Sequence, residues 1–193
     1  MKINEIFYSI QGEGFHAGTP AIFIRFSGCN LKCPFCDTKH QEGIEMSIND
    51  ILMDIVDYKA GFVVLTGGEP SLQVTNELIE ELHNHGYYVA TETNGTKELP
   101  IGIDWVTCSP KGDWERQGEK IVNRHYNEVK VVNDGKNDVD RWLSISSDNY
   151  YLQPCDTGDK DKNQLIIEDT IKKCLDNPIW KISLQTQKIL NVR

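Results

Sequence analysis

The stretch Ser27-Gly28-Cys29-Asn30-Leu31-Lys32-Cys33-Pro34-Phe35-Cys36-Asp37-Thr38 decides how this chain is organised. It places three cysteines at a C-x3-C-x2-C spacing, with no fourth cysteine nearby. Three thiolates so close in sequence can hold one face of a metal centre, and soft thiolate ligands favour an iron–sulfur cluster or zinc. A [4Fe–4S] cluster held by only three cysteines keeps one iron free of protein ligands, and that iron can chelate a small molecule.

Two other interpretations of these cysteines remain open. His40 could complete a Cys3His set of four ligands, as in a structural zinc site. The thiols could also lie buried without any metal. The other three cysteines stand singly and are expected to act as small apolar side chains. They are Cys108, Cys155 and Cys174.

Length and composition indicate one soluble domain spanning residues 1–193. Hydrophobic residues make up 39% of the chain and charged residues 25%, which is ordinary for a globular protein. The net charge of −9 argues against a nucleic acid or an anionic membrane as the main partner. The N-terminus lacks the apolar run of a signal peptide, so we expect a cytoplasmic protein.

Short apolar runs alternate with helical patterns along the chain. Strands are expected at residues 21–26, 62–66, 87–91, 105–108, 129–132 and 150–153, with a late strand at 180–184. Helices are expected at residues 47–58, 74–85 and 164–175, the first with a capping box from Ser47 and Asp50. This alternation predicts an α/β fold with a mostly parallel sheet. A closed TIM barrel takes about 250 residues, so we expect a partial TIM-like βα barrel of about six parallel strands with few helices.

The loops after the expected strands carry the remaining motifs, where parallel α/β folds bind their ligands. Gly67-Gly68-Glu69-Pro70 follows the second strand. Its glycines let the backbone approach a ligand closely, and Glu69 offers an acceptor to a cationic amine. Glu92-Thr93-Asn94-Gly95, Ser109-Pro110-Lys111 and Gln153-Pro154 follow the third, fourth and sixth strands. Ordinary turns remain an alternative, above all for Asn94.

The cysteine spacing and the Gly-Gly-Glu-Pro motif together resemble the radical S-adenosylmethionine (SAM) enzymes. The resemblance implies a [4Fe–4S] cluster on Cys29, Cys33 and Cys36, with SAM on the open iron. It also implies that a 5′-deoxyadenosyl radical does the chemistry, so no side chain is expected to act as catalytic acid or base. The residues implied to surround SAM, with Glu92 on the ribose hydroxyls, are Phe35, Gly68, Glu69, Glu92, Asn94, Ser109, Lys111 and Gln153.

Four further segments resemble one branch of that superfamily, the 7-carboxy-7-deazaguanine synthases. They are residues 8–14 (YSIQGEG), 18–25 (GTPAIFIR), 36–40 (CDTKH) and 183–186 (SLQT). The resemblance implies a carbon–nitrogen lyase that converts 6-carboxy-5,6,7,8-tetrahydropterin into 7-carboxy-7-deazaguanine with loss of ammonia, on the route to queuosine. It also implies a homodimer and a one-electron reductant such as flavodoxin or ferredoxin. Another small radical SAM enzyme, such as a glycyl-radical activase, and a non-enzymatic zinc module are the alternatives.

The same resemblance assigns residues to the substrate. Arg25 would bind its carboxylate, and Thr38 would bind Mg²⁺. The C-terminal tail at 185–193 would fold over the pterin, with Gln187 where the family commonly has histidine, and with the Arg193 carboxylate on the pterin. Alternatives are polar loop groups, an Arg25 paired with a neighbouring acid, and a frayed tail. The residues implied to contact the substrate are Gln11, Gly12, Glu13, Arg25, Thr66, Gln187 and Arg193.

Overall fold

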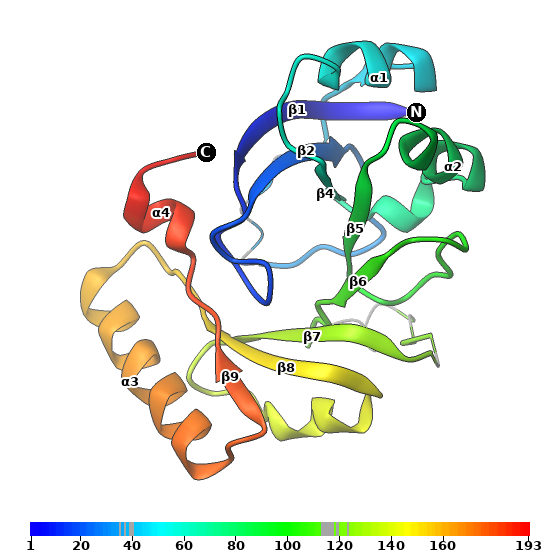
Figure 1. The fold of residues 1–193 in the computed structure, drawn as a ribbon. Coiled ribbons are helices and arrows are strands. Elements are labelled where there is room, and N and C mark those ends of the chain that lie inside the picture. Colours follow the sequence, from blue (N-terminus) through cyan, green and yellow to red (C-terminus); the bar gives the residue numbers. More distant parts are fainter. Residues whose placement is uncertain (35, 37, 39–40, 113–117, 119, 123) are drawn as a thin grey trace.

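Nine strands form a single sheet in the computed structural model, which describes residues 1–34, 36, 38, 41–112, 118, 120–122 and 124–193 (Figure 1). The strand order is β3-β1-β2-β4-β5-β6-β7-β8-β9. From β2 to β9 neighbouring strands are parallel, whereas β1 runs antiparallel to both β2 and β3. The bounds are β1 Lys2–Ile10, β2 Pro20–Phe26, β3 Ile44–Glu45, β4 Phe62–Gly67, β5 Tyr88–Thr93, β6 Trp105–Cys108, β7 Tyr126–Asn133, β8 Ser147–Pro154 and β9 Trp180–Ile182.

The sheet curves into an open barrel with its few helices on the outside (Figure 1). The fold class and all of the predicted strands are confirmed. The helices are α1 Ile48–Ile55, α2 Asn76–Asn84, α3 Lys160–Asp176 and α4 Thr186–Leu190, with short 3-10 turns at Pro70–Leu72 and Asp140–Ser144. No helix in the described residues is long and apolar enough to cross a membrane.

Some boundaries differ from the predictions, and β1 and β3 lie outside the predicted strands. The register of β1 against β2 shifts between Ile3 and Glu5, which breaks the period-two pattern that marks a strand in a sequence. The capping box of Ser47 and Asp50 is confirmed, although α1 ends three residues earlier than expected. Helix α3 begins four residues earlier than expected, because Asp159 caps its N-terminus.

The outer face of the sheet carries two apolar cores. One packs β1, β2, β4 and β5 against α1 and α2, and the other packs β6 to β9 together with the residues around the 3-10 turn Asp140–Ser144. The inner face of the same strands has a smaller cluster around the stacked rings of Phe7 and Phe23, whose centroids lie 4.9 Å apart. Because this inner cluster is small, the barrel interior also has room for polar side chains from the ends of the strands.

The loop between β1 and β2 packs against the N-terminal ends of the parallel strands. His16 on this loop packs against Phe62 and Trp105, with ring centroids 4.9 Å and 4.6 Å away. Both partners are the first residues of their strands. Because aromatic rings occupy the N-terminal ends of the strands, access to the interior is from the C-terminal ends, where parallel α/β folds bind ligands.

Candidate active site

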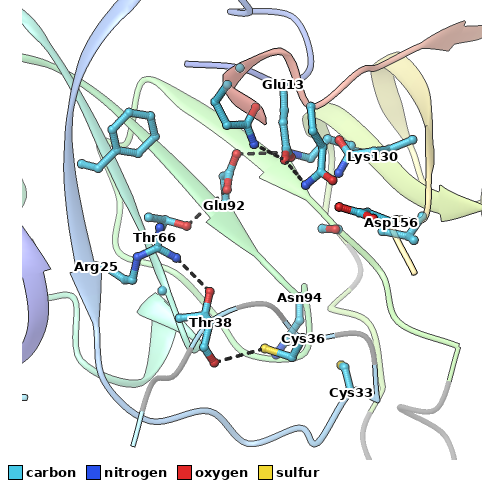
Figure 2. Close-up of a pocket in the computed structure, with 18 of the residues that line it drawn as sticks. Glu13, Arg25, Cys33, Cys36, Thr38, Thr66, Glu92, Asn94, Lys130 and Asp156 are labelled. Atoms are coloured by element: carbon cyan, nitrogen blue, oxygen red, sulfur yellow. Dashed lines mark hydrogen bonds and ion pairs between the residues drawn. The ribbon is translucent and has the colours of Figure 1, made fainter. Parts of the chain in front are cut away.

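One cavity of about 280 Å³ opens at the C-terminal ends of the strands. It collects nearly all of the predicted site residues, from both ends of the chain (Figure 2). Among the predicted residues, those that line it are Gln11, Gly12, Glu13, Arg25, Cys29, Cys33, Cys36, Thr38, Thr66, Gly68, Glu92, Asn94, Ser109, Lys111, Gln153, Gln187 and Arg193. Phe35, and the His40 of the zinc alternative, lie outside the described residues.

The three cysteines of the C-x3-C-x2-C motif lie at one end of this cavity, on the loop that follows β2. The glycine turn after β4 supports that loop, since Glu69 N–H donates to the Gly28 carbonyl at 2.8 Å. A Cβ on Gly68 would stand 1.8 Å from the same oxygen. The close approach of these two loops therefore requires glycine at position 68.

The carboxylate of Glu69 is buried and does not line the cavity, and its contact with a ligand amine stays a prediction. Its side chain is fully buried and accepts hydrogen bonds from Ser71 N–H and Oγ, from Thr93 Oγ and from Asn94 N–H, at 2.7–3.1 Å. These bonds join the turn after β4 to the loop after β5. Glu69 thus helps to hold Asn94 at the cavity wall.

Asn94 and Ser109 line the cavity beside the cysteines. Asn94 Nδ2 donates to Asn30 Oδ1 at 2.9 Å, and its Oδ1 accepts from Thr96, so the predicted turn is also present. Lys111 Nζ donates to Ser109 Oγ at 2.8 Å. The loop after β5 therefore contacts the cysteine loop, and the loop after β6 lines the same cavity, as expected for a cofactor held between them.

A second polar group lies deeper in the cavity and is built around Lys130 of β7. Lys130 Nζ pairs with Glu13 Oε2 at 2.6 Å and with Glu92 Oε1 at 3.1 Å. Glu92 also accepts from Gln11 Nε2 at 3.3 Å and from Thr66 Oγ1 at 3.2 Å. Glu92 thus lies among the residues predicted for the substrate. Its assignment to the ribose of SAM stays a prediction.

Arg25 faces the cavity from β2 between two partners. Its Nε lies 2.9 Å from Glu5 Oε1, and its Nη1 donates to Thr38 Oγ1 at 2.8 Å. The guanidinium also lies over the Phe7 ring, 5.6 Å from the centroid. The alternative that Arg25 pairs with a neighbouring acid is therefore correct, and it is compatible with a place on the cavity wall.

The C-terminal tail runs from β9 through α4 towards β1 (Figure 1). Four of its residues, Gln185, Gln187, Lys188 and Arg193, line one side of the cavity. Thr186 donates to the Gly12 carbonyl through its N–H at 3.1 Å and its hydroxyl at 2.9 Å. Gln187 Nε2 donates to Glu13 Oε1 at 3.1 Å. Further along, Arg193 pairs with Glu5, and its backbone oxygen accepts from Ser9 Oγ. The tail is therefore docked against β1 and the β1–β2 loop, and its closure over a substrate stays a prediction.

Comparisons with known proteins agree with this geometry. The family model described as the radical SAM superfamily matches residues 23–143. A 7-carboxy-7-deazaguanine synthase of Bacteroides thetaiotaomicron is 49% identical over 192 residues, covering 100% of this chain and 98% of that protein. One of Haemophilus influenzae is 36% identical, covering 99% and 93%. The chain belongs to the 7-carboxy-7-deazaguanine synthases of the radical SAM superfamily.

A solved structure supports the same assignment to the 7-carboxy-7-deazaguanine synthases. The crystal structure of QueE from Escherichia coli superposes with a TM-score of 0.78 at 32% identity, covering 95% of this chain and 92% of that one. As a radical SAM enzyme the chain uses a [4Fe–4S] cluster and SAM. The donor set fits, since three thiols line one cavity. Within the described residues, no group of three or more His, Cys, Asp or Glu side chains is arranged so that it could hold a metal ion.

Sequence reasoning missed several residues of this 7-carboxy-7-deazaguanine synthase site. Lys130 had a signal, because it is a lone charge in the apolar run Val129-Lys130-Val131-Val132. Glu5 lies in β1, which was not predicted as a strand. Cys155, expected to be inert, lines the cavity. Cys108 does behave as expected, since it is fully buried and burial raises the pKa of its thiol to about 12.

Proposed function

We propose that this chain converts 6-carboxy-5,6,7,8-tetrahydropterin into 7-carboxy-7-deazaguanine with loss of ammonia. It would act as a radical SAM carbon–nitrogen lyase in 7-deazapurine and queuosine biosynthesis. One observation carries the proposal: a single cavity has the cysteine motif at one end and a polar, carboxylate-rich group at the other (Figure 2). Two ligands can thus meet between them, one at each end.

The cysteine end of the cavity is proposed to hold the cofactors. Cys29, Cys33 and Cys36 would bind the [4Fe–4S] cluster, which with SAM supplies a 5′-deoxyadenosyl radical when bound. Further contacts with SAM are proposed from the C-terminal ends of β5 and β8, from the loops after β4, β5 and β6, and from the cysteine loop. The residues proposed for these contacts are Phe35, Gly68, Glu69, Glu92, Asn94, Ser109, Lys111 and Gln153.

The polar end is proposed to hold the pterin. Gln11 and Glu13 would hydrogen-bond its amide and amino edge, because amide and carboxylate groups can read such an edge directly. Arg25 would bind the substrate carboxylate through its planar guanidinium. Gly12 lets Gln187 approach, since a Cβ there would stand 1.8 Å from Gln187 Oε1. Gln187 cannot titrate near neutral pH, so it would position the substrate rather than move a proton.

Thr38 is proposed as a ligand of Mg²⁺, with water and substrate oxygens completing the octahedral coordination. In the structure its hydroxyl accepts from Arg25, the residue proposed for the substrate carboxylate. The metal and the carboxylate would therefore meet at one point of the wall. Thr66 and Arg193, which also line the cavity, are proposed as further substrate contacts.

A single anaerobic assay tests the function. The protein, reconstituted with iron and sulfide and supplied with SAM, Mg²⁺ and a reductant, should consume the carboxy-tetrahydropterin and release ammonia and 7-carboxy-7-deazaguanine. Turnover without any partner protein would exclude a glycyl-radical activase. A colourless protein with one zinc, in place of a brown protein with about four irons, would instead support the zinc module.

Three finer features belong to the same proposal. A flavodoxin or ferredoxin is proposed as the one-electron reductant, because the reductive cleavage of SAM needs one electron delivered to the [4Fe–4S] cluster. We also propose a homodimer and a cytoplasmic location, on the resemblance and the composition. Light scattering and reduction assays with purified flavodoxin would test the first two.

A further inference from the structure

Lys130 is the buried cation at the centre of the polar end of the cavity. Its side chain is only 6% exposed, and it projects from the middle of β7 into the barrel interior (Figure 2). Among the lysines that the structure describes, it alone is buried. A buried ammonium is costly unless it is paired and hydrogen-bonded, so its partners must explain its presence.

Those partners are carboxylates from separate elements. Glu13 comes from the β1–β2 loop and Glu92 from β5, at 2.6 Å and 3.1 Å from the Lys130 ammonium. Glu128, on the same strand as Lys130, adds a third negative group nearby. Its carboxylate accepts from Phe15 N–H at 3.0 Å. Burial raises the pKa of Glu128.

Every described side-chain partner of Glu13 is a donor. One carboxylate oxygen accepts from Lys130, and the other accepts from Gln185 Nε2 at 2.9 Å and Gln187 Nε2 at 3.1 Å. This arrangement suits an ionised carboxylate, which has only acceptor positions. Burial alone would raise the pKa of Glu13, but the charge of Lys130 and the hydrogen bonds lower it to about 2.

We propose that Lys130 is a positioning residue that keeps Glu13 as an ionised acceptor and thereby selects the substrate class. The selected ligand is a heterocycle that presents an amino group and a ring N–H to Glu13, rather than an oxo group at the same place. This inference rests on the proposed function and deepens it. A site built for donors rejects an analogue that lacks them, because buried polar groups then stay unpaired.

The test compares Lys130→Met with Lys130→Arg, which keeps the charge, and with Lys162→Met as an exposed control. Calorimetry would measure pterin binding to cluster-loaded, SAM-bound protein without reductant, from about pH 6 to about pH 9. Wild type, Lys130→Arg and Lys162→Met should bind with nearly constant affinity. Lys130→Met should bind about tenfold more weakly at the acid end and recover as the pH rises, because its buried Glu13 must first lose a proton.

A second ligand sharpens the result. The analogue with oxygen in place of the exocyclic amino group should be rejected by wild type and should gain affinity relative to the pterin in Lys130→Met. In that variant a protonated Glu13 can donate to the oxo group. The absorbance spectrum of the reconstituted cluster should be the same in all variants, because the described contacts of Lys130 do not include the three cysteines, and this would show that the cysteine end of the cavity is intact.

The outcomes separate the two proposals. Pterin binding by wild type together with an unchanged pH profile and selectivity in Lys130→Met would overturn the role of Lys130 alone. A wild-type protein that neither binds nor consumes the pterin would refute the proposed function and the substrate class with it. Should Lys130→Met not fold, the infrared difference between wild type and Glu13→Gln at neutral pH decides. Carboxylate bands support the inference, and the band of a protonated acid overturns it.

Discussion

Arg25 shows how one side chain of this site is held from two sides. Glu5 forms an ion pair with its Nε, Thr38 accepts a hydrogen bond from its Nη1, and the guanidinium lies over the Phe7 ring. Arg193 lies over the same ring and pairs with the same Glu5. Glu5 therefore joins the residue proposed for the substrate carboxylate to the end of the tail.

Replacement of Glu5 by Gln should loosen this arrangement. We expect the KM for the pterin to rise several-fold, because Arg25 loses the partner that orients it, whereas SAM cleavage without substrate should not change. The pair is about a quarter exposed on each side, so the effect on stability should stay below about 1 kcal/mol. Steady-state kinetics would check this, with the exposed Glu45→Gln as control. An unchanged KM would contradict the role of Glu5.

Thr38 allows a sharp test of the metal ligand. Thr38→Ala removes one hydroxyl, and Mg²⁺ demands near-ideal octahedral oxygen coordination. The variant should keep its cluster and its SAM cleavage but lose most of the stimulation by Mg²⁺, while Thr38→Ser should retain it. Turnover titrated with Mg²⁺ measures the difference. Equal stimulation of Thr38→Ala and wild type would remove Thr38 from the metal site.

The cysteines can be told apart by their place in the molecule. Cys36→Ala should abolish both the cluster absorbance and the reductive cleavage of SAM, because the cluster would lose one of three protein ligands. Cys174→Ala should leave both intact, since Cys174 packs on the outer face of the sheet, away from the cavity. Ultraviolet–visible spectra after anaerobic reconstitution give the answer. Loss of the cluster in Cys174→Ala would overturn the three-ligand assignment.

At the scale of elements, loops after neighbouring parallel strands support one another. The turn after β4 donates from Gly68 N–H to Phe26 and from Glu69 N–H to Gly28, which joins it to the end of β2. The Glu69 carboxylate continues this contact to the loop after β5. The cysteine loop is thus held by its neighbours in the sheet order.

Gly68→Ala should break this support. A Cβ would stand 1.8 Å from the Gly28 oxygen and 3.2 Å from Cys29 N, so the backbone of the cysteine loop must shift. We expect a strongly reduced cluster content after reconstitution, measured as iron per protein. Gly61→Ala is the matched control, because its Cβ would meet nothing within 4 Å. A full complement of iron in Gly68→Ala would show that the loops tolerate the shift.

At the scale of the whole molecule, the tail joins the two edges of an open barrel. It leaves β9 at one edge, contacts the β1–β2 loop through Thr186 and Gln187, and reaches Glu5 and Ser9 of β1 near the other edge. The Glu13 and Lys130 pair lies beneath this crossing. The ionised state of this pair should therefore contribute to the stability of the folded protein.

The pH dependence of stability should report this coupling. The folded-state pKa of Glu13, about 2, lies below its ordinary value of 4.5, so its contribution is present above the ordinary value. The contribution is lost as the pH falls towards the folded-state pKa. The melting temperature of wild type should therefore fall between about pH 5 and about pH 3 more steeply than that of Glu13→Gln, which cannot titrate. Parallel pH profiles in scanning calorimetry would contradict the assignment.

Local patterns predicted the parallel strands and the motifs that follow them, because the residues that follow consecutive parallel strands must meet at one edge. The family resemblance supplied the residues proposed for the substrate. Glu69 shows where that reasoning stops. Its position after β4 was predicted correctly, but the direction of its carboxylate depends on donors from Ser71, Thr93 and Asn94. The irregular β1 shows a second limit, since a bulge hides its periodicity.

The sequence by itself determined the cysteine motif, the α/β class and the family, because each depends on residue types at short, regular spacings. Only the tertiary structure decided that Lys130 joins Glu13 to Glu92, and that the tail returns to β1. These contacts link residues up to 188 positions apart in the chain. Burial and ion pairing at such separations depend on how the sheet curves, which the spacing of nearby residues does not encode.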